Sequence, residues 1–252
     1  MAFIKLENVS VTFPIYSAGS RSLKNLVLSA TTGGRIGKDK HNHITVHALD
    51  NVSMEISHGD RVGLIGHNGA GKTTLLRVLG GIYTPNQGVV TIEGKVTPMF
   101  DVSLGIDPEG TGYENIILRG LYLGLSRAEA RRKTAEIAEF TELGEFLDLP
   151  VRTYSQGMQA RLAFAMATSI KPDILLLDEG IGAGDAAFFL KANERLDRFA
   201  KEAGAVVLAS HSEELIRKLC NKLILMEHGR ISWVGELDAG FQFYSRSIAK
   251  QS

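Results

Sequence analysis

The sequence contains a single cysteine, no long apolar run and no excess of either charge. Cys220 is alone among 252 residues, so no internal disulfide can form, which is typical of a chain that folds in a reducing compartment. The apolar run at residues 174–177 ends at Asp178, and no run reaches the roughly 18 residues of a membrane span. We therefore expect any association with a membrane to depend on a partner.

The absence of net charge argues against a nucleic-acid-binding protein, and the absence of an apolar leader argues against a secreted one. Lys and Arg together number 28, as do Asp and Glu, so no overall field attracts nucleic acid, and we expect no nucleic-acid partner. The first ten residues alternate like a strand and lack the apolar stretch of a signal peptide.

With 44% hydrophobic residues, the chain can bury the core of one domain with an appended lobe, or of two small domains.

The order of the expected elements is that of an α/β protein with a helical insertion. A glycine-rich turn and a helical pattern follow the third expected strand, which is the start of a βα unit. Thr111 with Glu114, and Ser126 with Glu129, fit capping boxes, so residues 111–171 predict a helical lobe. We expect strands at residues 3–13, 50–56, 61–66, 89–93, 174–178 and 205–210, and a hairpin over 222–235 that turns at His228 and Gly229.

Residues 66–73, GHNGAGKT, match the phosphate-binding pattern G-x-x-x-x-G-K-[ST]. The glycines let backbone N–H groups surround phosphate oxygens, and the following helix N-terminus adds about half a positive charge. Lys72 would reach the β- and γ-phosphates, and Thr73 would supply a ligand to Mg²⁺. The predicted binding residues of this loop are Gly66, His67, Asn68, Gly69, Ala70, Gly71, Lys72, Thr73 and Thr74.

Two further strand ends carry polar residues that suit phosphate chemistry. Asp178 follows a strongly apolar strand and would hold Mg²⁺, while Glu179 would orient and deprotonate the attacking water. His211 follows the strand at 205–210 and would sense the γ-phosphate. Each has a structural alternative, because an acidic pair can cap a helix and a histidine at a strand end can serve as a structural hydrogen-bonder.

The segment YSQGM at residues 154–158 predicts a second anion site. Ser155 offers a hydroxyl, Gly157 allows close backbone approach, and the helix that begins near Met158 presents unpaired N–H groups. A nucleotide has one γ-phosphate, which the first loop already holds, so this element would serve the nucleotide of another subunit. The simpler alternative is a helix with an ordinary N-cap.

The motifs GHNGAGKT, YSQGMQARLAFA, ILLLDE, GAGD and ASH, in this order over residues 66–211, resemble those of the ATP-binding subunit of ABC transporters. The resemblance implies an α/β P-loop core with a mixed sheet, flanking helices, N-terminal antiparallel strands and an inserted α-helical subdomain. It also implies ATP hydrolysis, the cofactors ATP and Mg²⁺, and a dimer with a second copy that sandwiches two ATP molecules. Asp185 of GAGD would link the two ATP sites, and Phe13 would stack on adenine. Tyr16 is the second choice for that role, and Phe13 has the alternative of ordinary core packing.

More narrowly, GIDPEGTGYENI, YSQGM and DEGIGAGD are similar to the branch that exports O-antigen, capsule or teichoic acid. This implies an ATPase at the cytoplasmic face of the bacterial inner membrane, bound to a dimeric integral-membrane permease, with a lipid-linked glycan as the transported substrate. We expect an ATP-binding domain over residues 1–240, with a helical subdomain at about 105–170. A short tail over 241–252 would follow, without the carbohydrate-binding domain that some members carry. The alternative is a soluble non-transporter ABC ATPase in iron–sulfur assembly or repair.

Two motifs depart from the general pattern of the family. The usual Leu-Ser-Gly-Gly-Gln signature is replaced by YSQGM at residues 154–158, which keeps the hydroxyl and the second glycine but lacks the final glutamine. No glutamine occurs between Gln87 and Gln156, so the Q-loop lacks the residue that names it. Three side chains in its place could reach Mg²⁺ through water, and the choice among them stays open: Asp101, Ser103 and Asp107.

The segment 14–45 is expected to be irregular and is rich in cations. One interpretation is a solvated loop. The other is a surface that meets lipid phosphates under the membrane, where each cation contributes about 1 kcal/mol. The segment contains Arg21, Lys24, Arg35, Lys38 and Lys40 against Asp39 alone, with His41 and His43 nearby.

Overall fold

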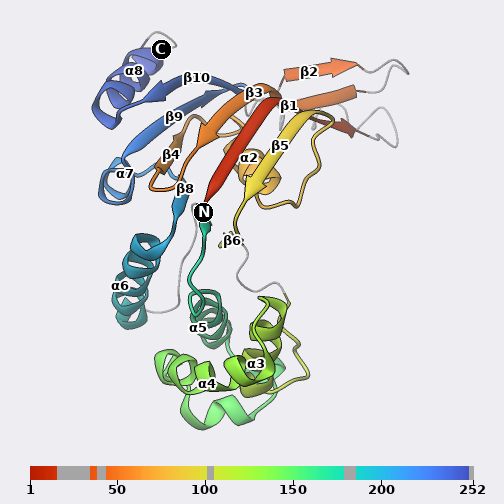
Figure 1. Ribbon diagram of the computed structural model, residues 1–252, viewed down its shortest axis with the longest axis vertical. Coiled ribbons are helices and arrows are strands. Elements are labelled where there is room, and N and C mark those ends of the chain that lie inside the picture. The colour runs from red at the N-terminus through yellow and green to blue at the C-terminus, as the bar shows by residue number, and fades with distance from the viewer. Residues whose placement is uncertain (16–34, 39–43, 101–104, 179–185, 250–252) are drawn as a thin grey trace. The chain divides into compact units, whose positions relative to one another are not determined.

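The computed structural model describes residues 1–15, 35–38, 44–100, 105–178 and 186–249, which form two compact units (Figure 1). The first unit comprises residues 1–96, 173–179 and 204–252, and the second comprises residues 97–172 and 180–203. In chain order the elements are β1 (Phe3–Ile15), β2 (Arg35–Lys38), β3 (Ile44–Ile56), β4 (Arg61–Ile65), α2 (Lys72–Leu79), β5 (Gln87–Glu93), β6 (Val96–Pro98), α3 (Gly112–Tyr122), α4 (Arg127–Thr141), η1 (Gly144–Asp148), η2 (Val151–Thr153), α5 (Gln156–Ala167), β7 (Ile174–Leu177), α6 (Ala186–Glu202), β8 (Ala205–Ala209), α7 (Glu213–Leu219), β9 (Lys222–Glu227), β10 (Arg230–Gly235) and α8 (Leu237–Ala249).

The first unit contains an antiparallel sheet with the strand order β2-β3-β1-β5. Its central strand β1 alternates, because Ile4 and Leu6 are buried whereas Glu7 is exposed. Ile4 lies opposite Ile56 of β3 on one side and Ile92 of β5 on the other. This sheet therefore presents a continuous apolar face to the core of the unit.

A second sheet has the order β10-β9-β4-β8-β7-β6, and all of its strands except β6 lie wholly in the same unit. Strands β9, β4, β8 and β7 pair in parallel. Every residue of β7 and β8 is buried. Strands covered on both faces need continuous apolar runs rather than alternation, which explains ILLL and AVVLA. Helix α2 contacts β3 of the first sheet and both β7 and β8 of the second.

The hairpin of β9 and β10 turns at the two residues expected from the sequence. His228 and Gly229 have φ angles of 48° and 80°. A two-residue turn with positive φ angles at both positions has a backbone twist that matches the right-handed twist of the strands. The turn also makes two long-range contacts, because Gly229 N donates to Ala70 O at 2.9 Å and Asp50 N donates to Gly229 O at 2.9 Å. The hairpin thus supports segments distant in the sequence.

Part of the segment expected to be irregular is regular in structure. Arg35–Lys38 forms β2 opposite residues 44–47, and β3 begins at Ile44 rather than at residue 50. Pairing with neighbouring strands stabilises β2 and the first part of β3. Their residues show no clear alternation of apolar and polar side chains, so these strands could not be predicted from the sequence. Strand β6 was likewise not expected. Arg21, Lys24 and Lys40 lie outside the described residues.

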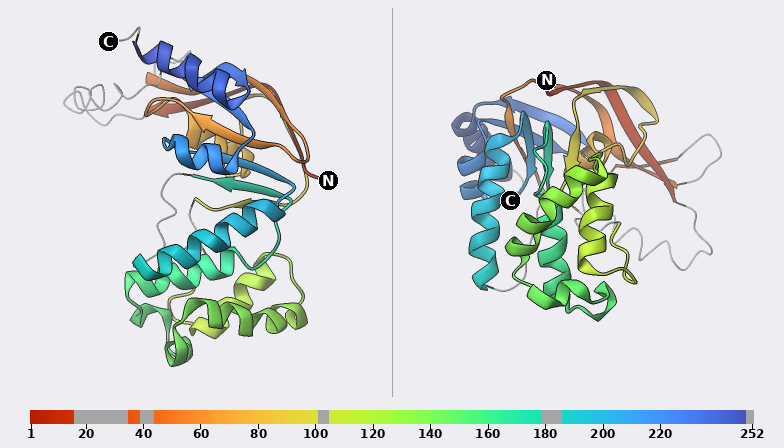
Figure 2. Two further views of the ribbon diagram at one scale, coloured as in Figure 1. Left: turned by 90° about the vertical axis from the view of Figure 1, so that its left-hand side faces the viewer. Right: turned by 60° about the horizontal axis from the view of Figure 1, so that its bottom comes forward.

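The second unit is mainly helical (Figure 2). Two of its helices begin with the capping boxes that the sequence predicts. At the start of α3, Thr111 Oγ1 accepts from Glu114 N at 3.1 Å, and Thr111 N donates to Glu114 Oε2 at 2.8 Å. Ser126 and Glu129 make the same pair of bonds at the start of α4. No helix within the described residues is both long enough and apolar enough to cross a bilayer.

Three phenylalanines join the helices of the second unit. The ring centroids of Phe140 on α4, Phe164 on α5 and Phe188 on α6 lie 5.4 to 6.3 Å apart. The guanidinium carbon of Arg195 lies 4.3 Å from the centroid of Phe140. Helix α6 therefore belongs to this unit, in addition to the segment 105–170 named above.

Substitution of Leu176 tests how much the burial of the parallel strands contributes to stability. Its side chain is 0% exposed at the centre of β7, so Leu176→Ala should lower the free energy of unfolding by about 2 to 5 kcal/mol through lost burial and a cavity. The measurement is the midpoint of urea unfolding followed by circular dichroism. The matched control is Leu190→Ala, since Leu190 is 69% exposed and its loss should change stability by less than about 0.5 kcal/mol. Equal losses in the two variants would contradict this account of the core.

Candidate nucleotide-binding site

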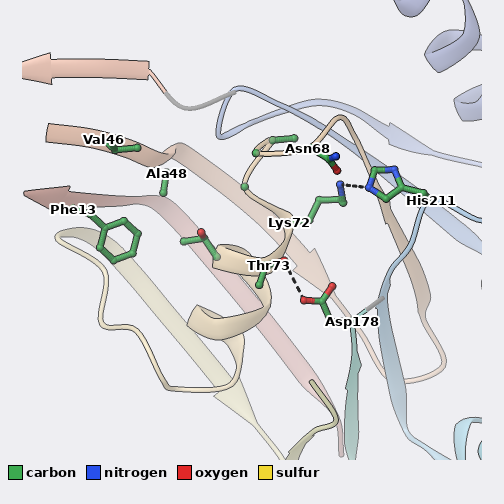
Figure 3. Close-up of a pocket in the computed structure, with 12 residues that line it drawn as sticks. Phe13, Val46, Ala48, Asn68, Lys72, Thr73, Asp178 and His211 are labelled. Atoms are coloured by element: carbon green, nitrogen blue, oxygen red, sulfur yellow. Dashed lines mark hydrogen bonds between the residues drawn. The ribbon is translucent and has the colours of Figure 1, made fainter. Parts of the chain in front are cut away.

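Three polar segments meet at one edge of the parallel sheet (Figure 3). The loop 66–71 follows β4, His211 follows β8 and Asp178 follows β7, and these strands are neighbours in the order β4-β8-β7. The carboxyl ends of parallel strands lie at the same edge, where open α/β sheets bind their ligands. The fold thus brings together side chains from positions far apart in the sequence.

The loop after β4 can take its path only with glycine at two positions. A Cβ on Gly66, where φ is 151°, would overlap the carbonyl oxygen of Met226. A Cβ on Gly71, where φ is 106°, would lie 2.7 Å from Ala48 O. Gly71 is the N-cap of α2, so the first N–H groups of this helix point toward the loop and can receive an anion.

Lys72 places a buried ammonium group inside this loop. Its Nζ donates to Gly66 O at 2.6 Å and to His67 O at 3.3 Å, and lies 3.3 Å from His211 Nε2. Two loop carbonyls therefore hold the cation in place. The ammonium can donate to His211 only when Nε2 of that ring carries no proton.

Thr73 and Asp178 form an oxygen pair that suits Mg²⁺. Thr73 Oγ1 donates to Asp178 Oδ2 at 3.0 Å. Magnesium usually takes one or two protein oxygens and completes its shell with water and substrate phosphates. Among the described residues, no cluster of three or more His, Cys, Asp or Glu side chains could hold a metal alone. The hydroxyl and carboxylate therefore fit an ion that arrives with a nucleotide.

These groups open into a cavity of about 570 Å³, a size typical of small-molecule sites. One wall consists of Phe13 on β1 with Val46 and Ala48 on β3 (Figure 3). Phe13 pairs with Val46 in the strand register, and its ring meets the edge of Tyr83 at a centroid distance of 5.2 Å. No sequence motif marks Val46 and Ala48, because they reach the cavity only through the pairing of β3 with β1. The other residues that line it are Asn68, Gly69, Ala70, Gly71, Lys72, Thr73, Thr74, Asp178 and His211.

Gly66 and His67 shape the start of the loop. Both carbonyls accept from Lys72, and the His67 ring packs against His228 of the hairpin turn at a centroid distance of 4.8 Å. Several predicted residues lie outside the described residues: Glu179, Asp185, Tyr16, Asp101 and Ser103. Of the three candidates for the Q-loop role, Asp107 is described, and its Oδ1 accepts from Glu109 N at 3.0 Å in the helical unit.

The YSQGM segment starts α5 in the helical unit, whereas the phosphate loop belongs to the other unit. Ser155 is the N-cap of α5, and its Oγ accepts from Met158 N at 3.3 Å. A Cβ on Gly157 would meet only Ser155 Oγ, at 3.9 Å, so the space beside this helix start is open. The capping bond leaves the Ser155 hydroxyl proton available to a ligand.

Residues 49–182 match the family described as ABC transporter, and the chain belongs to that family. It is 52% identical over 231 residues to the O-antigen export system ATP-binding protein RfbE of Yersinia enterocolitica. These residues make up 92% of this chain and 97% of that protein. It is 35% identical to the O-antigen export system ATP-binding protein RfbB of Klebsiella pneumoniae, over 98% of both chains. It is 32% identical to the teichoic acids export ATP-binding protein TagH of Bacillus anthracis, of whose length it covers 43%.

Solved structures agree with the family assignment. A dimeric structure of a bacterial ABC transporter cassette superposes with a TM-score of 0.67 at 25% identity, over 93% of this chain and 98% of that one. The predicted fold class, an ABC-type P-loop core with N-terminal antiparallel strands and a helical subdomain, is therefore confirmed. The prediction that the chain is an ATPase of this family is also confirmed.

Gly66 offers a test of the loop geometry. Gly66→Ala should weaken ATP binding about tenfold or more, because the new methyl group displaces the loop from Met226 and removes N–H contacts to phosphate. Calorimetric titration with ATP measures the change. The matched control is Gly59→Ala, since Gly59 also has a positive φ, of 93°, but has nothing within 4 Å of an added Cβ. The geometry would be wrong if both variants bound ATP as the parent chain does.

Proposed function

We propose that this chain is the ATP-binding and hydrolysing subunit of an ABC transporter that exports a lipid-linked, O-antigen-like polysaccharide across the bacterial inner membrane. The observation that carries the proposal is the 52% identity to an O-antigen export subunit, which extends over 92% of this chain and 97% of that relative. The cavity at the phosphate loop supports the ATP chemistry. The relatives described above are export subunits, so the alternative of a soluble repair or iron–sulfur assembly ATPase is not favoured.

ATP would bind with its phosphates against the loop and its base toward β1. Lys72 would bind the β- and γ-phosphates, and the first N–H groups of α2 would add the helix dipole. Phe13 forms part of the cavity wall and would stack on adenine. Thr73 and Asp178 would hold Mg²⁺, which would supply positive charge to stabilise the phosphate oxygens.

Hydrolysis would need a base and a group that positions the γ-phosphate. Glu179 follows Asp178 directly, so it would accept a proton from the water that attacks phosphorus while the bond to the β-phosphate oxygen breaks. His211 lies beside Lys72 and would donate a hydrogen bond to the γ-phosphate, which requires its ring to present a protonated nitrogen to that group. Glu179 would thus deprotonate the attacking water, and His211 would position the γ-phosphate.

A second copy of the chain would complete each site. Ser155 and Gly157, at the start of α5, would bind the γ-phosphate held by the loop of the other copy, and Asp185 would link the two sites. The open space beside Gly157 and the available hydroxyl proton of Ser155 support this role. The dimeric form of the similar cassette structure also supports it.

The helical unit would transmit closure of this dimer to a dimeric permease at the cytoplasmic face of the membrane. The proposed contact is the segment 100–125. Its helix α3 leaves Leu118, Leu121 and Tyr122 exposed, which is unusual for large apolar side chains on a free surface. A permease segment that packs there would bury them.

Glu179→Gln separates binding from hydrolysis. Loss of the general base should lower the ATPase rate by about 10²- to 10⁴-fold, while MgATP still binds and drives dimerisation. Light scattering at saturating MgATP reports the dimer, and phosphate release reports the rate. Lys72→Ala is the control, since it should lose nucleotide binding and stay monomeric. A Glu179→Gln chain that remains monomeric with MgATP would refute the sandwich dimer.

Affinity purification from native membranes tests the export role. The tagged chain, extracted in detergent, should recover one multi-span permease encoded with polysaccharide genes, as identified by mass spectrometry. Leu118→Glu should reduce that recovery at unchanged ATPase rate, because a charge would enter the proposed contact. The matched control is Val234→Glu, at an exposed apolar position of the other unit. Recovery of only soluble proteins would instead favour a non-transporter ATPase.

A further inference from the structure

A second cavity lies within the helical unit and is rich in cations. Its volume is about 250 Å³, and it opens among α4, the C-terminal end of α5 and the later turns of α6. Such a gathering of positive side chains on one hollow requires either internal acids or an external anion to balance it. Four cations and two acids line it, together with two hydroxyls and one ring: Lys133, Lys171, Arg195, Arg198, Glu136, Glu202, Thr168, Ser169 and Phe199.

Two of the four cations have a structural role. Arg195 Nε donates to Thr168 Oγ1 at 2.8 Å, and its terminal nitrogen donates to Glu136 at 3.1 Å. Lys133 Nζ donates to Ser169 O at 2.8 Å. Since Thr168 and Ser169 lie just beyond α5, the two cations satisfy the negative end of that helix. Both would be present whether or not the cavity had a ligand.

The other two cations have no such explanation. Within the part of the chain that the structure describes, neither Arg198 nor Lys171 makes an ion pair or a side-chain hydrogen bond, and both are exposed at the rim. Arg198 lies one turn from Arg195 on α6, so two guanidinium groups face one hollow. Glu136 already balances Arg195, and Glu202 is the other acid of the hollow, so four cations face two acids and an added anion would reduce the remaining repulsion.

The ionisation of Arg195 reflects this local field. Burial lowers the pKa of its guanidinium, Glu136 acts in the opposite direction, and the positive charge of Arg198 lowers the pKa further. The Arg195 side chain is only 12% exposed, and its bonds to Thr168 hold it in one orientation. A fixed guanidinium loses little freedom when it binds an oxyanion, which favours binding.

We propose that this cavity binds a phosphate-type oxyanion through Arg195, Arg198 and Lys171. The Arg198 guanidinium can match the oxygens of phosphate in bidentate geometry, whereas Arg195, which already donates through Nε and one terminal nitrogen, would add its other terminal nitrogen. A flexible lysine at the rim can follow a ligand of varied shape. With less than half the volume of the nucleotide cavity, the hollow suits a phosphate or pyrophosphate group rather than a whole nucleotide. The group comes either from a free anion or from a phosphorylated lipid head, and the chemistry of recognition is the same.

Calorimetric titration with inorganic pyrophosphate tests the site. The titration is made in the full-length Lys72→Ala chain, so that the phosphate loop contributes little. Adding Arg198→Gln and Lys171→Gln should weaken pyrophosphate binding about tenfold or more, since two charge-assisted contacts are lost. Both side chains are exposed, so the urea midpoint should not change.

The matched control removes the same charge elsewhere on the helical unit. Arg127→Gln with Arg131→Gln changes two exposed cations of α4 that do not line the cavity, and it should leave pyrophosphate binding unchanged. Equal weakening by both pairs would mean general charge attraction and would overturn the proposal. Unchanged binding in the Arg198 and Lys171 pair would overturn it as well.

Vesicles distinguish the two sources of the phosphate group. Phosphatidylcholine vesicles with and without phosphatidic acid are sedimented with the full chain and with both double variants. Binding that needs phosphatidic acid together with Arg198 and Lys171 would assign the site to a lipid head. Pyrophosphate binding without such vesicle binding would assign it to a free anion. If neither ligand depends on this pair, the cavity is no phosphate site.

Discussion

The candidate nucleotide site depends on one buried cation. Lys72 is 9% exposed, and a charge removed from water must be compensated by nearby dipoles. The loop supplies them by directing two of its own carbonyls at the ammonium, which in turn fixes the curve of the backbone. That curve leaves its N–H groups and the start of α2 facing the cavity. Gly66 and Gly71 permit this path of the loop, and the strand order places the loop beside Asp178 and His211. The hairpin turn packs against the loop through the bond between Gly229 and Ala70.

Features that depend on neighbouring residues in the sequence were predicted correctly. The capping boxes at Thr111 and Ser126 and the turn at His228 each need only a few adjacent residues with defined φ preferences. Strand β2 and the walls of the cavity at Val46 and Ala48 were not predicted. Their positions are set by the register of β3 against its neighbours, and no local periodicity encodes which distant strand will pair.

The two cavities use opposite ends of helices. At the nucleotide cavity, α2 offers its N-terminus, where unpaired N–H groups favour an anion directly. At the helical cavity, α5 offers its C-terminus, which repels anions and must first be covered by cations. Arg195 and Lys133 do this, so the positive character of the second cavity is carried by side chains. The first anion site is therefore built into the backbone, whereas the second depends on side chains, of which Arg198 and Lys171 can be substituted without uncovering the end of α5.

The contact between the hairpin turn and the phosphate loop has a consequence for biosynthesis. Gly229 bonds to Ala70, yet it follows that residue by about 160 positions, which takes a ribosome about 8 to 32 s to translate. Asp178 and His211 also emerge after the loop. The nascent loop therefore spends that interval without the turn that supports it, and its backbone groups have water as their partner. The full set of contacts around the loop is consequently completed only when β9 and β10 have left the ribosome.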